Sequence, residues 1–296
     1  MKKIHNILAI ALLLTTSAMM AQQESVISFY SQHMNLVNPA YVGVDSLTIA
    51  TSSLRKQWTG VAQAPETQTV SFGTPLGKNV GFGMTVINDQ NFIEKQTYVS
   101  VDFSYRLKMS KTADVYFGIK AGGNSYNVNA PGLLTYNIQS DPALGSINTF
   151  NPNVGVGALY KEGALYVSLS IPRLLNNKKA INDEGYANIS MDSPHFFLSG
   201  GYDVPLQSKF SSLVLRPSVM LRYVTGAPVS IDLTAMLQIE KNFEIGGMYR
   251  TDKAYAAMST IRLSKRFLFG FAYEMSTQPT LASARNTNEI LLKFLF

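Results

Sequence analysis

Apolar and polar residues alternate one by one along most of this chain. The pattern is clearest over residues 95–108, where one face carries Val99, Val101, Phe103, Tyr105 and Leu107 and the other Ser100, Asp102, Ser104, Arg106 and Lys108. Successive side chains of a β-strand point to opposite faces, so this alternation predicts a strand with one apolar face. The final run, residues 286–296, alternates in the same way and ends on Phe294 and Phe296.

Strand-like segments recur along the sequence at regular intervals. We place them at 46–57, 66–74, 79–88, 95–108, 113–123, 152–161, 164–171, 195–204, 211–224, 229–240, 242–250, 254–264, 267–276 and 286–296. Even strand numbers are typical of single-chain outer-membrane barrels. The pattern therefore predicts an all-β fold, a transmembrane antiparallel outer-membrane β-barrel of about fourteen strands over residues 45–296. Phe294 and Phe296 would serve as its assembly signal. A soluble β-sandwich is the alternative, and it would require neither a terminal Phe nor loops of unequal length.

The connections between these strands differ in length on alternate sides. Those after even strands are tight, at 75–78, 109–112, 161–163, 205–210, 240–242 and 264–266. Those after odd strands are usually longer, at 59–65, 89–94, 124–151, 172–194 and 277–285. Short turns face the periplasm in outer-membrane barrels, so we expect both chain termini to lie there.

The amino terminus is typical of an export signal. Lys2 and Lys3 precede an apolar core at 7–14, and small residues follow at 17–21. We expect residues 1–21 to be removed, with cleavage after Ala21 or Ala18. The apolar core is too short for a membrane anchor, so the mature protein would leave the cytoplasm.

Residues 22–44 do not alternate, and they are rich in amides and aromatic residues. Asn38-Pro39 and Gly43 mark turns in this stretch. Two interpretations stay open for this segment. It could fold into the barrel lumen as a plug, or it could be a tethered periplasmic lead-in.

Charge and residue chemistry narrow the possible functions. The net charge of +6 is too mild to indicate nucleic-acid binding, and the absence of cysteine excludes disulfides and thiolate sites. His33 and His195 have no partners at metal-ligand spacing, and no nucleophile motif is present. We therefore expect no enzyme, no metal and no cofactor.

Charged residues of both signs fall on the polar face of the last six predicted strands. They are Arg216, Arg222, Asp232, Glu244, Arg250, Arg262, Glu274, Glu289 and Lys293. Because both signs are present, we favour a paired network that stiffens the wall of the lumen, rather than a selectivity filter.

Several motifs in the first third of the chain resemble one family. They are Phe29-Tyr30-Ser31-Gln32, Asn38-Pro39-Ala40-Tyr41-Val42-Gly43, Arg55-Lys56-Gln57-Trp58-Thr59-Gly60, Ala64-Pro65-Glu66-Thr67-Gln68-Thr69 and Val80-Gly81-Phe82-Gly83 with Asn88-Asp89. In this order they resemble the PorP/SprF outer-membrane proteins of type IX secretion and gliding motility. Val42 and Val44 stand where the family often has smaller residues, which affects how the segment would pack.

The resemblance implies a function based on binding, without catalysis. Such a barrel would support export or surface attachment of large adhesin-like proteins with a C-terminal signal domain, or link to periplasmic or lipoprotein components of the machine. It would also meet the barrel-assembly machinery and the lipid bilayer. The candidate plug or partner-binding residues are Phe29, Tyr30, Ser31, Gln32, Asn35, Asn38, Pro39, Tyr41, Gly43, Arg55, Gln57, Trp58, Pro65, Thr67 and Gln68. A passive diffusion channel for small solutes is the alternative function.

Overall fold

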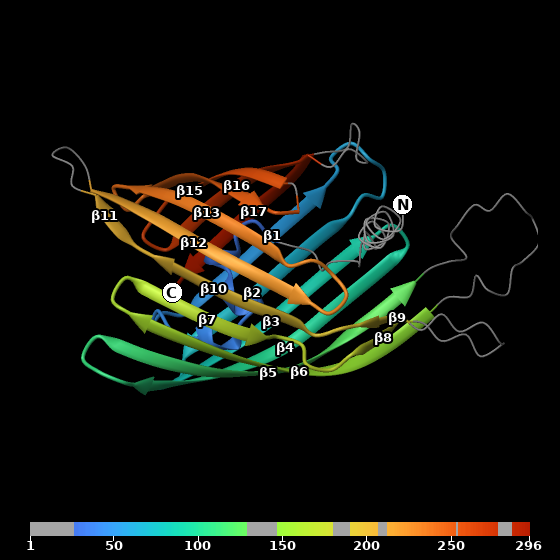
Figure 1. The fold of residues 1–296 in the computed structure, drawn as a ribbon, viewed down its shortest axis with the longest axis horizontal. Helices are drawn as coiled ribbons and strands as arrows, with labels where there is room; N and C mark the ends of the chain where they lie inside the picture. The colour runs from blue at the N-terminus through green and yellow to red at the C-terminus, as the bar shows by residue number, and fades with distance from the viewer. Residues whose placement is uncertain (1–26, 129–146, 180–189, 207–211, 253, 278–285) are drawn as a thin grey trace, which may run out of the picture.

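The computed structural model describes residues 27–128, 147–179, 190–206, 212–252, 254–277 and 286–296. Fourteen antiparallel strands form a closed β-barrel (Figure 1), which confirms the predicted fold class. They are β1 (Ile49–Gln57), β2 (Glu66–Pro75), β3 (Val80–Asn91), β4 (Glu94–Lys108), β5 (Ala113–Val128), β6 (Ile147–Glu162), β7 (Leu165–Ile171), β10 (His195–Tyr202), β12 (Leu213–Val224), β13 (Ser230–Ile239), β14 (Phe243–Arg250), β15 (Ala254–Arg262), β16 (Phe267–Ser276) and β17 (Asn286–Leu295). Within these ranges no helix is long and apolar enough to cross a membrane.

The barrel closes by pairing the first strand with the last. β1 and β17 run antiparallel with Ile49 opposite Leu295 and Gln57 opposite Thr287. β10 pairs with β12, so every strand of the wall has two neighbours. A short strand β11 (Val204–Leu206) prolongs β10 along β12, and β8 (Asn177–Lys179) pairs with β9 (Ser190–Asp192) as a separate hairpin. Closure leaves the wall without a free edge, as a membrane barrel requires.

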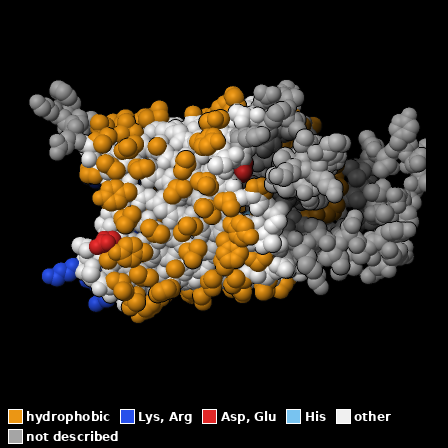
Figure 2. All heavy atoms as spheres, viewed as in Figure 1, with side chains coloured by type: hydrophobic (Ala, Val, Ile, Leu, Met, Phe, Trp, Pro, Cys, Tyr) orange, Lys and Arg blue, Asp and Glu red, His pale blue; other side chains and the backbone are white. Residues whose placement is uncertain are grey.

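The alternating sequence explains which side chains face the lumen. In β4, Ser100, Asp102 and Ser104 are buried, whereas Val99 and Phe103 are exposed on the outside. Hydrophobic side chains are spread over the face of the outer wall that Figure 2 shows. The wall thus carries an apolar surface toward lipid and a polar surface inward.

Two loops are shorter than the sequence predicted. Residues 89–94 were expected to form a loop, but β3 runs to Asn91 and β4 starts at Glu94, which leaves a two-residue turn. The predicted loop 124–151 also shrinks, because β5 extends to Val128 and β6 begins at Ile147. Polar residues there indicated loops. In a barrel, strands can continue beyond the apolar belt, where polar side chains meet water.

The two ends of the barrel differ. The connections β2–β3, β4–β5, β6–β7, β13–β14 and β15–β16 are tight turns at one end, which we call the short-turn end. Phe296 lies at this end too, where its backbone N–H donates to the Thr48 carbonyl just before β1. The opposite, long-loop end carries the β8–β9 hairpin and the β1–β2 connection, residues 58–65.

Residues 27–48, which we call the N-terminal segment, lie inside the barrel (Figure 1). The segment has no strand and folds into three 3-10 turns: η1 (Tyr30–Gln32), η2 (Met34–Leu36) and η3 (Pro39–Tyr41). Its side chains contact inward-facing residues of strands from both halves of the barrel. The buried core of this molecule is therefore formed where side chains of the N-terminal segment pack against the inner wall.

Candidate functional site

The Asn38-Pro39 pair sets the path of the N-terminal segment. The Asn38 side-chain oxygen accepts a hydrogen bond from the Ala40 backbone N–H, and proline fits the first position of η3 because it has no N–H to satisfy. The Asn38 side-chain amide donates to the carbonyls of Ala158 and Leu169 on β6 and β7. This asparagine is fully buried, so it both caps the turn and ties it to the wall.

Three apolar clusters hold the segment against different parts of the wall. Phe29 packs among inward side chains of β13 to β17: Met236, Met248, Ala256, Met258, Leu268, Ala272 and Leu291. Tyr30 and Met34 pack on Phe197 and Met220 of β10 and β12. Ala40 packs on Tyr116 and Leu159 of β5 and β6. A large aromatic buried in this way contributes about 1.5–3 kcal/mol.

Hydrogen bonds join the segment to most of the remaining strands. His33 bonds to Ser71 of β2, and Ser104 of β4 donates to the Val42 carbonyl. Ser170 of β7 donates to the Val37 carbonyl at 2.8 Å. The Lys120 ammonium of β5 donates to the Asn35 carbonyl at 3.2 Å. Backbone groups that lie outside regular structure are thus satisfied by inward-facing side chains.

Glycines on the inner wall make room for the segment's backbone. A Cβ added at Gly118 of β5 would collide with the backbone of Pro39 and Ala40, and one at Gly157 of β6 with the Asn38 side chain. A Cβ at Gly81 of β3 would collide with the Val42 carbonyl. The inner wall is therefore complementary in shape to this segment.

A buried charge network ties the same segment to the barrel's closing seam. Arg55 of β1 contacts Glu274 at 2.8 Å and Glu289 at 3.4 Å. Ser28 joins them, because its backbone N–H donates to Glu289 at 2.7 Å and its hydroxyl to Glu274 at 3.1 Å. Charges this deeply buried need such partners, so the network holds β1, β16, β17 and the segment in one arrangement.

The network continues along the wall through alternating signs. Arg250 contacts Glu274 and Asp232, and Asp232 also contacts Arg222, all within 3.1 Å. Arg216 contacts Glu244 in a neighbouring pair. Within the residues described, Arg262 and Lys293 have no carboxylate partner.

Sequence reasoning missed two parts of this arrangement. It named Arg55 as a plug or partner contact, and Arg55 does donate to the Ser28 hydroxyl, but its ion pairs in the charge network were not foreseen. It also overlooked Asp102 and Lys120, which form a fully buried ion pair at 2.8 Å on the opposite wall. Both lie at inward positions of adjacent strands and face each other in register, which correct strand alignment would have revealed.

The candidate plug and partner-binding residues fall into two groups. The first group lies in the N-terminal segment: Phe29, Tyr30, Ser31, Gln32, Asn35, Asn38, Pro39, Tyr41 and Gly43. Arg55 belongs with it, because its side chain donates to the hydroxyl of Ser28 in the same segment. Gln57, Trp58, Pro65, Thr67 and Gln68 lie instead around the β1–β2 connection at the long-loop end. There the Gln57 backbone N–H donates to the Pro65 carbonyl, and the Thr67 hydroxyl to Asp89. The structure does not bring the two groups together.

Burial determines the charge state of His33. The imidazole is 2% exposed, and burial, helped by the nearby Lys293 and Lys120, lowers its pKa from 6.5 to about 3. His33 is therefore neutral near pH 7. Among the residues described, no group of three or more His, Asp or Glu could hold a metal ion.

The architecture defines a class: an outer-membrane β-barrel whose lumen is occupied by its own N-terminal segment. Omp33 of Acinetobacter baumannii has a similar fold, with a TM-score of 0.51 and 8% identity over 85% of this chain and 98% of that one. The KdgM porin gives a TM-score of 0.41 at 8% identity, over 84% of this chain and 99% of that one. No curated protein matches the chain.

The family follows from the sequence match. Residues 19–294 match the model of the type IX secretion system membrane protein PorP/SprF. The chain belongs to this family, which confirms the resemblance seen in its motifs. It is thus an outer-membrane component of type IX secretion, and the absence of catalysis stays a prediction.

Proposed function

We propose that this barrel acts by binding. It supports export or surface attachment of large adhesin-like proteins that carry a C-terminal signal domain, and it links them to periplasmic components of the secretion machinery. The observation that carries the proposal is the occupied lumen, where the N-terminal segment contacts strands around the wall. Solutes would find little free passage there, which disfavours a diffusion channel.

The way the lumen is filled supports a dedicated role. A barrel of fourteen strands encloses more space than one of eight strands, whose interior side chains can fill. It has fewer strands than open porins, which have 16–18. Here the additional space is taken by a folded segment with buried partners. A wall shaped around one peptide, with glycines where its backbone passes, suits an interaction scaffold better than a pore.

Deleting residues 24–42 tests this proposal in two measurements. In planar bilayers the intact protein should conduct little, and the deletion should raise conductance sharply, because the wall then encloses water. In cells, the same deletion should abolish surface display of the adhesin exported with this protein. Heat-modifiable migration of the variant checks that the barrel still folds.

The result that would overturn the proposal is specific. If the intact protein already shows large, stable conductance, solute diffusion becomes the leading function. If the deletion leaves adhesin display at the wild-type level, the segment has no part in recruiting partners.

A further inference from the structure

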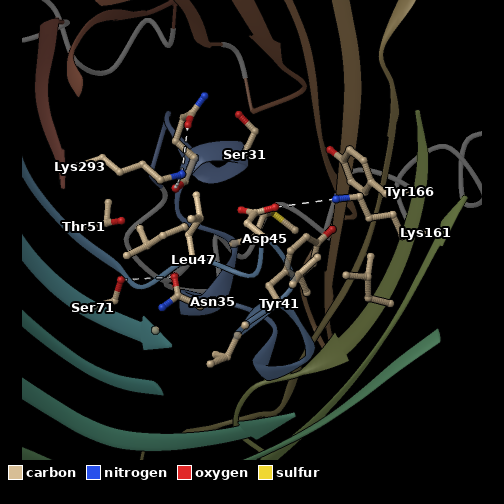
Figure 3. Close-up of a pocket in the computed structure, with 18 residues that line it drawn as sticks. Ser31, Asn35, Tyr41, Asp45, Leu47, Thr51, Ser71, Lys161, Tyr166 and Lys293 are labelled. Atoms are coloured by element: carbon tan, nitrogen blue, oxygen red, sulfur yellow. Dashed lines mark hydrogen bonds and ion pairs between the residues drawn. The ribbon is translucent and has the colours of Figure 1, made fainter. Parts of the chain in front are cut away.

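A cavity of about 200 Å³ opens at the short-turn end of the barrel, between the N-terminal segment and the wall (Figure 3). Its floor is formed by η1 and η2, and its wall by the ends of β1, β2, β6 and β17. Asp45 and Leu47 at its mouth are exposed, so the cavity communicates with solvent. Pockets for drug-sized ligands measure roughly 300–1,000 Å³. This cavity is smaller and suits about one residue of a polypeptide.

Lys293 of β17 makes no direct contact with a carboxylate of the described residues, although Asp45 lines the same cavity. Its ammonium donates only to the backbone and side-chain oxygens of Gln32, at 3.4 and 3.5 Å, which is beyond the usual hydrogen-bond range. By contrast, the buried Lys120 contacts Asp102 at 2.8 Å. Among the described residues, Lys293 forms no ion pair. A partly buried ammonium with such weak partners is suited to receive an anion.

The charges around Lys293 are of both signs. Asp45 and Glu244 attract its ammonium group electrostatically, and Arg262 and Arg216 repel it. Lys161 also lines the cavity, and its contact with Asp45 is long, at 3.8 Å, and largely exposed. The lining therefore holds two lysines and one aspartate, and a concave site with such an excess of cations concentrates anionic groups.

The rest of the lining divides into an apolar and a polar part. Met34, Val42, Leu47, Ile49 and Leu159 supply apolar surface, while Ser31, Asn35, Thr51 and Ser71 supply hydroxyl and amide groups. A free carboxyl-terminal residue combines a carboxylate, a backbone N–H and a side chain within a few ångströms. An acidic side chain inside a chain offers the carboxylate alone and leaves the apolar part unused.

We propose that this cavity binds the carboxyl-terminal residue of a partner polypeptide. The carboxylate contacts Lys293, and an apolar terminal side chain packs against Leu47 and Ile49. The site deepens the proposed function in one respect, because it gives that function a contact at the short-turn end, which we place in the periplasm. The binding itself depends neither on orientation nor on cargo export.

Fluorescence polarisation with the full-length protein in detergent tests the site. The probes are fluorescein-labelled pentapeptides: Gly-Ser-Gly-Ser-Leu with a free carboxylate, the same peptide as its amide, and an amidated Gly-Ser-Glu-Ser-Gly. We expect the free-carboxylate peptide to bind and amidation to weaken binding at least tenfold. The internal Glu should not restore it.

Two variants and one control locate the binding. Lys293→Met keeps the length of the side chain without its charge and should weaken binding at least tenfold. Ser31→Trp fills the cavity from an exposed position and should do the same while leaving Lys293 intact. Lys78→Met, an exposed lysine in the β2–β3 turn at the same end, should bind as the wild type does.

Several outcomes would overturn the proposal. One is equal affinity for the amidated peptide, and another is unchanged binding by both cavity variants. Tight binding of the internal Glu peptide would assign the site to acidic side chains instead. No binding of any probe at millimolar concentration would leave the site without this function, even if the deletion of residues 24–42 abolishes adhesin display.

Discussion

At the scale of single residues, His33 makes docking of the N-terminal segment depend on pH. Its pKa is about 3 when docked and 6.5 when free, so the docked state binds fewer protons in between. The stabilisation is fully present above pH 6.5 and is lost as the pH falls toward 3. Docking should weaken by up to about tenfold, or 1.4 kcal/mol, per pH unit over that range.

Hydrogen exchange of residues 27–44 between pH 7 and pH 5, corrected for intrinsic rates, measures this change. His33→Gln removes the titrating ring and keeps a hydrogen-bonding group opposite Ser71. The variant should show a flatter pH dependence than the wild type. Equal slopes in both proteins would assign the pH dependence to other groups.

Gly118 shows how one missing methyl group positions the segment. In Gly118→Ala the new Cβ would meet the backbone of Pro39 and Ala40, which cannot move away as a flexible side chain would. We expect the segment to dock poorly and bilayer conductance to rise, with the barrel itself still folded.

Gly247→Ala on β14 is the matched control. Its new Cβ would approach only the Ala256 carbonyl, at 3.3 Å, and would touch nothing in the segment. The control should conduct as little as the wild type. Equal conductance of the two variants would contradict the close fit inferred at Gly118.

At the scale of elements, β17 is the strand on which closure depends. It pairs with β1 on one side and β16 on the other. The Phe294 and Phe296 rings pack edge to face, with 4.7 Å between the ring centroids. Phe296→Ser should lower the amount of heat-modifiable barrel in the outer membrane, because it removes roughly 1.5–3 kcal/mol of burial in lipid as well as the assembly signal. Phe92→Ser, in the exposed β3–β4 turn, is the control, and equal loss in both variants would exclude a special role for the last strand.

The elements themselves could be predicted from the sequence, because alternation reports directly on a wall between lipid and lumen. The start of β4 and both bounds of β16 agree with the prediction to within one residue. Alternation fails where strands leave the membrane, as at Asp89–Asn91 of β3, because polar side chains there are solvated on both faces. The internal path of residues 27–44 has no period to detect, and its partners are set by three-dimensional proximity.

At the scale of the whole molecule, loop lengths predict the orientation of the barrel. A cysteine-free chain allows single-cysteine labelling without further changes. Val61→Cys, at the long-loop end, should react with a membrane-impermeant maleimide in intact cells, and Ser110→Cys in the β4–β5 turn should react only after the outer membrane is opened. The reverse pattern would place both chain termini outside.

The bond between Ser28 and Glu289 spans 261 residues, which has a consequence for folding kinetics. Contacts so distant along the chain form only after the intervening loop has closed, and high contact order slows folding. Ser28 therefore reaches its final place only after the last strand has been added. Until the segment docks, we expect the lumen to hold water, and the cell must tolerate or seal that opening.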